Sequence, residues 1–162
     1  MWTSIDSPVG PLRLVENQDA ITAIEFDPPT PSGQGQGRPI GDRADTHPLL
    51  VETATQLRAY FDRDLKEFDL PLRPDGTPFQ LKVWEQLRTI GYGQTATYGE
   101  IAGSLGMTGH GARAVGLANG RNPIPIVIPC HRVIGADGTL TGYAGGVERK
   151  QLLLNLETDA LF

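Results

Sequence analysis

The first 26 residues alternate between apolar and polar positions, as half-buried strands do. Apolar residues recur from Leu12 to Phe26, and a turn signal rich in Pro and Gly precedes them. This pattern predicts a hairpin or meander of strands over residues 2–26. The segment 28–48 is rich in Pro, Gly, Gln and Asp and cannot supply a core, so we expect a loose surface loop there.

Helical periodicity follows this loop. A helix is predicted over residues 49–65, because five apolar positions share one face: Leu50, Ala54, Leu57, Tyr60 and Phe61. The alternating stretch 68–72 fits a strand that returns to the sheet. The turn at 73–76 then marks the best internal boundary. We therefore predict an N-terminal structural domain, 1–76, and a C-terminal domain, 77–162.

Short helices are predicted in the second half. Thr77 and Pro78 are typical of a helix start, with threonine as the N-cap and proline in the first turn. A second helix should begin near Tyr98, and a third should cover 110–119 after a turn that contains glycine, which suggests a helix-turn-helix. A final helix is predicted over 147–157. The expected fold class is α+β, with a small antiparallel sheet and a helix followed by a mostly helical domain that carries the helix-turn-helix and an active-site loop.

The third predicted helix carries unusually little side chain on much of its surface. Its small residues are Gly111, Ala112, Ala114, Gly116 and Ala118. Glycine lowers helix stability, so another backbone should approach closely. On the residues alone, tight helix packing is the simpler explanation and DNA contact is the alternative. A bare surface with one arginine, Arg113, would suit contact with phosphates that does not read the base sequence.

The chain contains one cysteine, Cys130, which follows the apolar run 124–128 and directly precedes His131 and Arg132. The run predicts a buried extended segment that ends at a protected thiol. Thiols react as thiolates, and nearby imidazole or guanidinium groups favour that form. Local chemistry leaves a nucleophile and a small buried hydrophobe evenly balanced. Neighbours in an extended chain point to opposite sides, so His131 would reach the sulfur through a bridging water.

Composition narrows the classes of function. A single cysteine excludes an internal disulfide and a thiolate-rich zinc site, and the histidines at 47, 110 and 131 lack metal-ligand spacing, so no metal or other cofactor is expected. The sequence has no long apolar run and no signal-like start, so we expect no membrane span and a cytoplasmic location that suits a reduced thiol.

Charge is distributed unevenly along the chain. Residues 1–77 carry 7 basic and 13 acidic side chains, whereas residues 78–162 carry 7 and 6. The second half is near neutral, so DNA binding there would be modest and would rely partly on backbone amides and helix ends.

Residues 122–135 read Asn-Pro-Ile-Pro-Ile-Val-Ile-Pro-Cys-His-Arg-Val-Ile-Gly. This run closely resembles the active-site motif of O6-alkylguanine-DNA alkyltransferases, also called methylated-DNA–protein-cysteine methyltransferases. The resemblance is dense from 76 to 157 and looser before. It implies direct, stoichiometric transfer of the alkyl group from O6-alkylguanine in duplex DNA to Cys130, so that each molecule acts once. It also implies O4-alkylthymine as a substrate and flipping of the damaged base through the minor groove.

The resemblance implies roles for individual residues. His131 matches the residue that takes the thiol proton through a water, and Glu157 matches the carboxylate that orients this histidine. Tyr98 matches the tyrosine that donates to the guanine ring nitrogen, and Arg113 matches the arginine that replaces the flipped nucleotide. The rest of the DNA-binding surface would be Gly111, Ala112, Ala114 and Gly116.

The remaining matched positions support the site or line its pocket. Asn122 and Arg132 match structural supports of the active segment. The substrate pocket would consist of Tyr98, Cys130, Val133, Tyr143 and Ala144. Many relatives carry serine at the position of Ala144 and some carry another small residue at Leu117, so lesion preference and one DNA contact stay open.

Alternative functions can be distinguished from alkyl transfer by simple observations. No cysteine-rich metal module precedes the domain, so a transcriptional role is not expected. We expect a monomer in solution, with cooperative binding on DNA left open. The main alternative is a non-catalytic lesion-binding protein of the alkyltransferase-like type, which usually lacks the reactive cysteine. A cysteine hydrolase is a third reading, and it would turn over.

Overall fold

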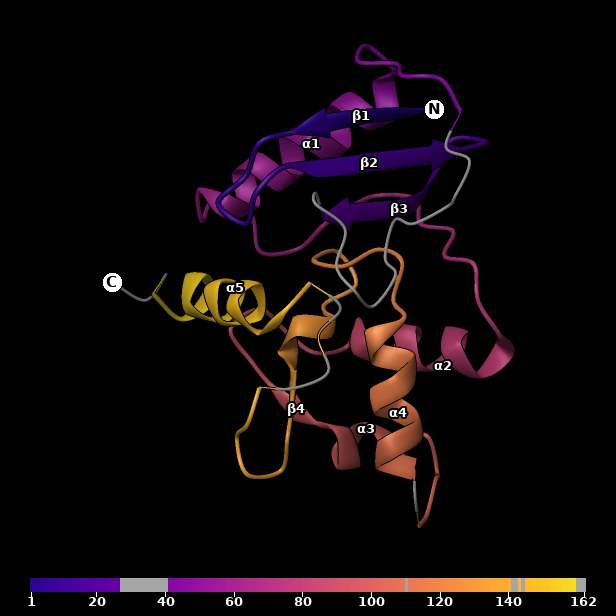
Figure 1. Ribbon diagram of the computed structural model, residues 1–162, viewed down its shortest axis with the longest axis vertical. Coiled ribbons are helices and arrows are strands. Elements are labelled where there is room, and N and C mark those ends of the chain that lie inside the picture. The colour runs from indigo at the N-terminus through magenta and orange to yellow at the C-terminus, as the bar shows by residue number, and fades with distance from the viewer. Residues whose placement is uncertain (27–40, 110, 141–142, 144, 160–162) are drawn as a thin grey trace.

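A three-stranded antiparallel sheet forms the N-terminal part of the molecule (Figure 1). The computed structural model describes residues 1–26, 41–109, 111–140, 143 and 145–159. The strands β1 (Trp2–Ile5), β2 (Leu12–Asn17) and β3 (Ala20–Phe26) follow one another in space in chain order, which confirms the predicted meander. A two-residue turn joins β2 to β3, with both of its residues at positive φ as the twist of a hairpin favours.

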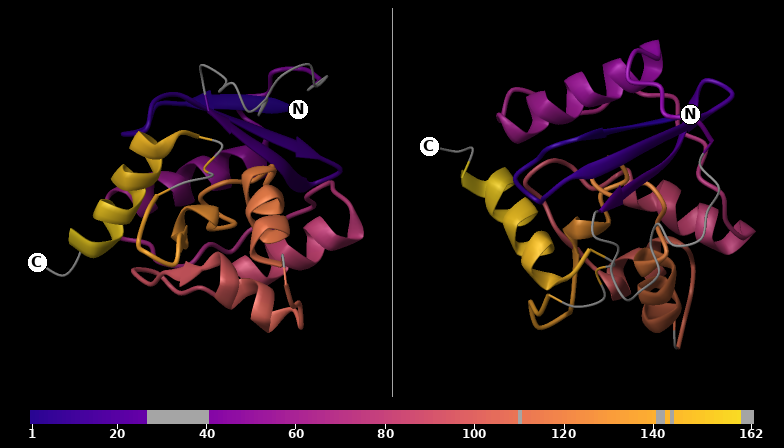
Figure 2. Two further views of the ribbon diagram at one scale, coloured as in Figure 1. Left: turned by 60° about the horizontal axis from the view of Figure 1, so that its bottom comes forward. Right: turned by 45° about the horizontal axis from the view of Figure 1, so that its top comes forward.

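The helix α1 (Pro48–Phe61) covers one face of this sheet, and the C-terminal elements lie on the other (Figure 2). His47 caps α1, because its Nδ1 accepts a hydrogen bond of 3.2 Å from the amide of Leu49. The buried face of α1 carries Tyr60 at its C-terminal end. That position brings a tyrosine of the N-terminal half to the boundary with the C-terminal half.

The segment before α1 is held more firmly than its composition predicts. The amide of Trp2 donates to the carbonyl of Asp42 at 3.1 Å, and the amide of Ala44 donates to the carbonyl of Trp2 at 2.8 Å. The prediction of a loose loop is therefore wrong for 41–47, because backbone pairing along the edge of β1 orders this part. Residues 28–40 of the predicted loop lie outside the described residues.

The predicted return strand at 68–72 is reduced to one bridge. Ile21 pairs with Leu72, and the amide of Ile21 donates to the carbonyl of Pro71 at 2.8 Å. Proline has no amide hydrogen, so Pro71 cannot extend the ladder. The segment still lies beside β3, as its alternating pattern indicated.

The helical half is built as its capping residues predict. The helix α2 (Pro78–Leu87) begins with Thr77, which exchanges two hydrogen bonds with Gln80, and α3 (Tyr98–Ser104) begins with an equivalent box between Thr97 and Glu100. The helices α4 (Gly111–Gly120) and α5 (Val147–Asp159) complete the half. Among the residues placed by the structure, no helix combines the length and the apolar character that a bilayer crossing requires.

A short parallel pair connects the helices to the cysteine. The strand β4 (Ala96–Thr97) pairs with β5 (Val133–Ile134), which directly follows the 3-10 turn η1 (Cys130–Arg132). Because α3 begins where β4 ends, this pairing brings the first residue of α3, Tyr98, close to the cysteine segment. One continuous apolar core joins the sheet, α1 and the helical half. The boundary at 76 stays a prediction.

Candidate active site

The segment before Cys130 is buried, as predicted, but it is not extended. The side-chain oxygen of Asn122 accepts a hydrogen bond of 3.0 Å from the amide of Ile124, and its amide donates to the carbonyl of Ile128 at 2.8 Å. Ile126 has φ of +74°, and the chain closes in a compact turn. The prolines at 123, 125 and 129 remove the donors that a strand would need. These two hydrogen bonds hold both ends of the turn, and the role of Asn122 as a support of the active segment stays a prediction.

Cys130 begins the 3-10 turn and is 2% exposed. Its carbonyl accepts a hydrogen bond of 3.3 Å from the side-chain amide of Asn119 in α4. Because the turn is helical, the extended geometry that would place His131 on the opposite side from the sulfur is absent. The helix with the small residues is therefore tied directly to the backbone of the cysteine.

The environment of the thiol acts in two directions. Burial raises the pKa of Cys130 to about 11. Hydrogen bonding by Asn122, the charge of Lys150 and hydrogen bonding by Tyr143 lower this pKa, but burial outweighs them. The thiol is therefore protonated in the resting protein at neutral pH. It becomes a nucleophile only if a base takes its proton.

Lys150 is a buried cation near the cysteine turn that the sequence did not single out. It is fully buried on α5, its ammonium donates to the carbonyl of Val133, and it lies 5.8 Å from the ring centre of Tyr98. Burial lowers the pKa of Lys150 to about 8. The signal was present in the sequence, because positions 150, 153 and 157 fall on one helical face. The structure shows that face buried throughout.

The carboxylate of Glu157 lies behind the cysteine turn and accepts five hydrogen bonds. Its Oε2 accepts hydrogen bonds from His131 Nε2 at 2.7 Å, from Tyr60 Oη at 2.6 Å and from Arg132 Nη2 at 3.0 Å. Its Oε1 accepts hydrogen bonds from Arg132 Nε at 2.9 Å and from the amide of Gly93 at 3.1 Å. Burial alone would raise the pKa of Glu157, but His131 and Arg132 outweigh burial and hold its pKa far below the usual range.

His131 is fully buried, and its two ring nitrogens have different surroundings. Burial, only partly offset by Glu157, lowers the pKa of His131, so the ring is neutral at physiological pH. A carboxylate can only accept, so the proton is assigned to Nε2. The other nitrogen, Nδ1, has no hydrogen-bond partner within the described part of the chain. It is an unoccupied base one residue from the thiol.

The structure places the expected DNA-binding residues on two sides of α4. Ala112 and Arg113 are exposed, and Leu117 is 68% exposed one turn further on. Gly111 is buried, and a Cβ there would lie 2.8 Å from Cβ of Met107 and 3.1 Å from Cβ of Ala102 in α3. These contacts fit tight helix packing, the simpler of the two explanations drawn from the residues, and a part for Gly111 in DNA binding stays a prediction.

The last two expected DNA-binding residues, Ala114 and Gly116, are less buried than the expected pocket residues Val133 and Tyr143. Ala114 and Gly116 are partly buried, and a Cβ at Gly116 would lie 3.7 Å from the ring of Tyr98. Val133 is buried, and Tyr143 packs its ring edgewise on Phe26 with centroids 6.1 Å apart. Ala144 lies outside the described residues.

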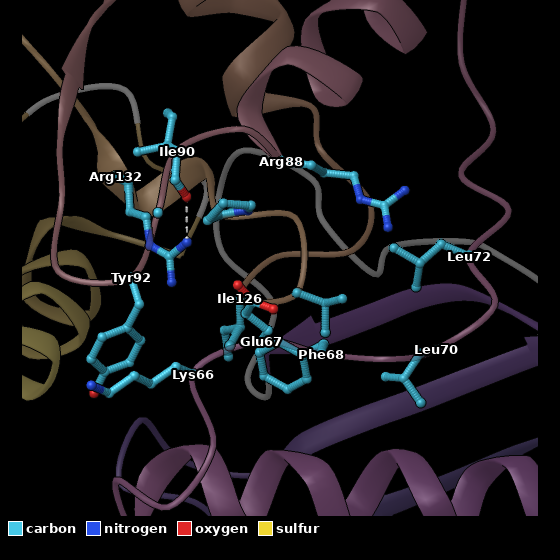
Figure 3. Close-up of a pocket in the computed structure, with 13 residues that line it drawn as sticks. Lys66, Glu67, Phe68, Leu70, Leu72, Arg88, Ile90, Tyr92, Ile126 and Arg132 are labelled. Carbon is cyan, nitrogen blue, oxygen red and sulfur yellow. Dashed lines mark hydrogen bonds between the residues drawn. The ribbon is translucent and has the colours of Figure 1, made fainter.

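A cavity of about 340 Å³ lies between segments 66–72, 88–92 and 126–132. Figure 3 shows the guanidinium of Arg132 donating to the carbonyl of Ile90, at 2.7 Å, in its wall. The same guanidinium donates two hydrogen bonds to Glu157, and the structural role of Arg132 stays a prediction. The cavity therefore borders the group of charges behind the cysteine.

Glu16, Asp19 and His47 bring three possible metal-ligand atoms within 4.8 Å of one another. However, His47 Nδ1 accepts the capping hydrogen bond of α1, so the neutral ring carries its proton on Nε2, which faces the carboxylates. A metal on Nε2 would move that proton to Nδ1 and break the cap. We therefore assign no metal to this cluster.

Known proteins resemble the chain over both halves. A family model described as "6-O-methylguanine DNA methyltransferase, DNA binding domain" matches residues 78–159, and one described as the "ribonuclease-like domain" of the same proteins matches residues 1–74. The methylated-DNA–protein-cysteine methyltransferase of Methanosarcina barkeri is 48% identical over 157 residues, which are 97% of this chain and 96% of that protein.

Solved structures give the same result. The crystal structure of Mycobacterium tuberculosis OGT in complex with DNA superimposes with a TM-score of 0.84 at 46% identity, covering 98% of this chain and 93% of that one. The O6-methylguanine DNA methyltransferase of Methanococcus jannaschii gives 0.67 at 25% identity, with coverage of 96% and 93%. The chain belongs to the 6-O-methylguanine DNA methyltransferase family.

Proposed function

We propose that this DNA repair methyltransferase transfers the alkyl group of O6-alkylguanine in duplex DNA to Sγ of Cys130, once per molecule. The observation that carries the proposal is the unoccupied Nδ1 of a neutral His131, held by Glu157, in the same turn as the only cysteine. A buried thiol with a raised pKa needs such a base.

The reaction proceeds by direct displacement. His131 Nδ1 takes the thiol proton, through a bridging water where the two atoms do not meet, and the charges around the turn stabilise the thiolate. Lys150 is the cation that acts on the sulfur. The thiolate attacks the alkyl carbon, the bond from carbon to O6 breaks, and its electron pair passes to the purine. Tyr98 gives a proton to the ring nitrogen, so guanine leaves neutral and Cys130 keeps the alkyl group as a thioether. The proton held by His131 then passes through water to the phenolate of Tyr98, so both residues end neutral.

Single turnover follows from the product. A thioether has no proton to lose, its alkyl group could be removed only by expelling a thiolate, and the chain has no second thiol, because Cys130 is the only cysteine. O4-alkylthymine presents the same alkyl–oxygen bond and is proposed as a second substrate. No metal or redox group takes part in any of these steps.

We propose that α3 and α4 act as a helix-turn-helix that enters the minor groove. The exposed face of α4 carries no acidic residue, and its small residues allow close approach to the phosphates. The target atom lies inside the duplex, so the nucleotide must be extruded, at a cost of a few kcal/mol. Arg113, exposed on α4, has the length and planarity to replace the lost base in the stack.

The alternative is a lesion-binding protein without transfer. The buried cysteine with its imidazole and carboxylate favours the enzyme, because binding alone requires none of these groups. The variant Cys130→Ser separates the two readings: we expect it to bind an O6-methylguanine duplex but to leave the methyl group on the base. Transfer retained in this variant would refute the mechanism, and a wild-type protein that binds without transfer would establish the alternative.

A further inference from the structure

Tyr60 links the N-terminal half of the chain to the carboxylate of the proposed active site. It lies on α1, is fully buried, and donates its hydroxyl proton to Oε2 of Glu157 at 2.6 Å, although the two residues are 97 positions apart. This is the shortest of the five hydrogen bonds to Glu157. Burial raises the pKa of Tyr60 far above its ordinary value, so the hydroxyl stays protonated and acts as a donor.

Tyr60 and His131 share the same oxygen. The hydroxyl of Tyr60 and Nε2 of His131 both donate to Oε2 of Glu157, at 2.6 and 2.7 Å. Each donor withdraws electron density from the oxygen that the other one uses. The strength with which Glu157 stabilises a protonated His131 therefore depends on Tyr60.

We infer that Tyr60 is a positioning residue, by which the N-terminal half fixes Glu157 and keeps His131 neutral and able to accept the thiol proton. The inference rests on the proposed role of His131 as the base. It assigns to the ribonuclease-like half a direct part in the chemistry of the other half. Tyr60 acts through Glu157 and does not touch the thiol or the DNA.

Other charged and polar groups around this pair come from several elements. They are Arg132 of η1, Lys150 of α5, the amide of Gly93, and Tyr92 in the segment between α2 and β4. Arg132 and Lys150 are cations and act against protonation of His131. Arg132 and Lys150 cannot replace the hydroxyl of Tyr60, because Arg132 already donates to Glu157 and Ile90 and Lys150 already donates to Val133.

Tyr92 provides a matched control. Its ring packs edgewise against that of Tyr60, with centroids 6.2 Å apart, and its hydroxyl is buried. Within the described residues that hydroxyl makes no hydrogen bond. Tyr92→Phe therefore removes a hydroxyl from the same aromatic cluster without changing the donors to Glu157.

The test is an NMR titration of the His131 imidazole in the wild type, Tyr60→Phe and Tyr92→Phe. Loss of the hydroxyl leaves more negative charge on Oε2, so Tyr60→Phe should raise the pKa of His131 by about one unit, or tenfold in the protonation equilibrium. Tyr92→Phe should leave it unchanged. An unchanged His131 in Tyr60→Phe, or an equal shift in both variants, would overturn the inference.

Alkyl transfer from free O6-benzylguanine gives a second readout. Since protonation of His131 removes the base, Tyr60→Phe should lose rate at acidic pH and recover it at alkaline pH, whereas a purely structural role would lower the rate equally at all pH values. The proposed function is tested separately by transfer in the wild type. A wild type that does not transfer would refute that function and leave the titration result standing.

Discussion

Replacing Glu157 with glutamine tests the buried charges most severely. Glutamine has nearly the same shape, but it removes the counter-charge of Arg132, which is 6% exposed and donates to both carboxylate oxygens. Leaving one member of a buried ion pair unpaired costs about 3–5 kcal/mol. This is a large part of the roughly 5–15 kcal/mol by which native proteins are stable. We therefore expect a sharp loss of stability at neutral pH.

The sign of the pH dependence follows from the depressed pKa of Glu157. The folded state favours the carboxylate more than the unfolded chain does, so this stabilisation is fully present above the ordinary glutamate value of 4.5. This stabilisation is lost as the pH falls from 4.5 towards the depressed pKa of Glu157 in the folded state. The difference in stability between wild type and Glu157→Gln should therefore shrink on acidification.

Urea unfolding at several pH values measures this effect, and Glu85→Gln is the control. Glu85 is 79% exposed and lies 3.8 Å from Arg88, so its loss should change the free energy of unfolding by no more than about 0.5 kcal/mol. Equal stability of Glu157→Gln and wild type at neutral pH would refute the reasoning. So would a difference that grows as the pH is lowered.

Three further predictions address the thiol, the exposed arginine of α4 and the packing of that helix. Lys150→Met should raise the pKa of the thiol by about one unit, because a nearby cation is lost; the pH dependence of iodoacetamide labelling measures this, and an unchanged profile would count against the assigned role. Arg113→Ala should slow duplex repair at least about tenfold more than the reaction with free O6-benzylguanine, because only the duplex requires base extrusion; equal losses would contradict the stacking role. Gly111→Ala should destabilise the fold by about 1–3 kcal/mol, since its Cβ would lie 2.8 Å from Met107. In Gly103→Ala, where no atom lies within 4 Å, alanine should stabilise α3 by up to about 1 kcal/mol; equal effects in thermal unfolding would reject the packing explanation.

Local signals in the sequence predicted much of the fold correctly. The N-cap at Thr77 and the start of a helix near Tyr98 depend on residues within one helical turn, and the structure shows a complete capping box at Thr77 and at Thr97. The sheet followed from alternation alone. The segment 124–128 was predicted as extended because an apolar run does not show how its prolines interrupt backbone pairing. The small residues of 110–119 left helix packing and DNA contact both open, because one sequence cannot distinguish a small residue that faces a ligand from one that faces another helix; the structure shows Gly111 packed against Met107 and Ala102.

The candidate site depended on contacts between distant parts of the chain. His131 and Glu157, 26 residues apart, were paired by resemblance to a motif, and the structure places them at 2.7 Å. Tyr60 was predicted as an ordinary core residue of α1, and no local pattern shows that its hydroxyl meets a carboxylate of α5. Lys150 was missed because a lysine is normally exposed, and only its spacing to Glu157 on the helix marks it as buried.

The central claim is that Cys130 accepts the alkyl group once and keeps it. The most direct test is the mass of the intact protein, followed by peptide mapping, after incubation with an excess of an O6-methylguanine duplex. The account predicts one added methyl group per molecule, on the Cys130 peptide, with one guanine restored for each protein consumed. An unmodified protein beside an intact lesion, or repair of many lesions per molecule without modification of Cys130, would contradict it.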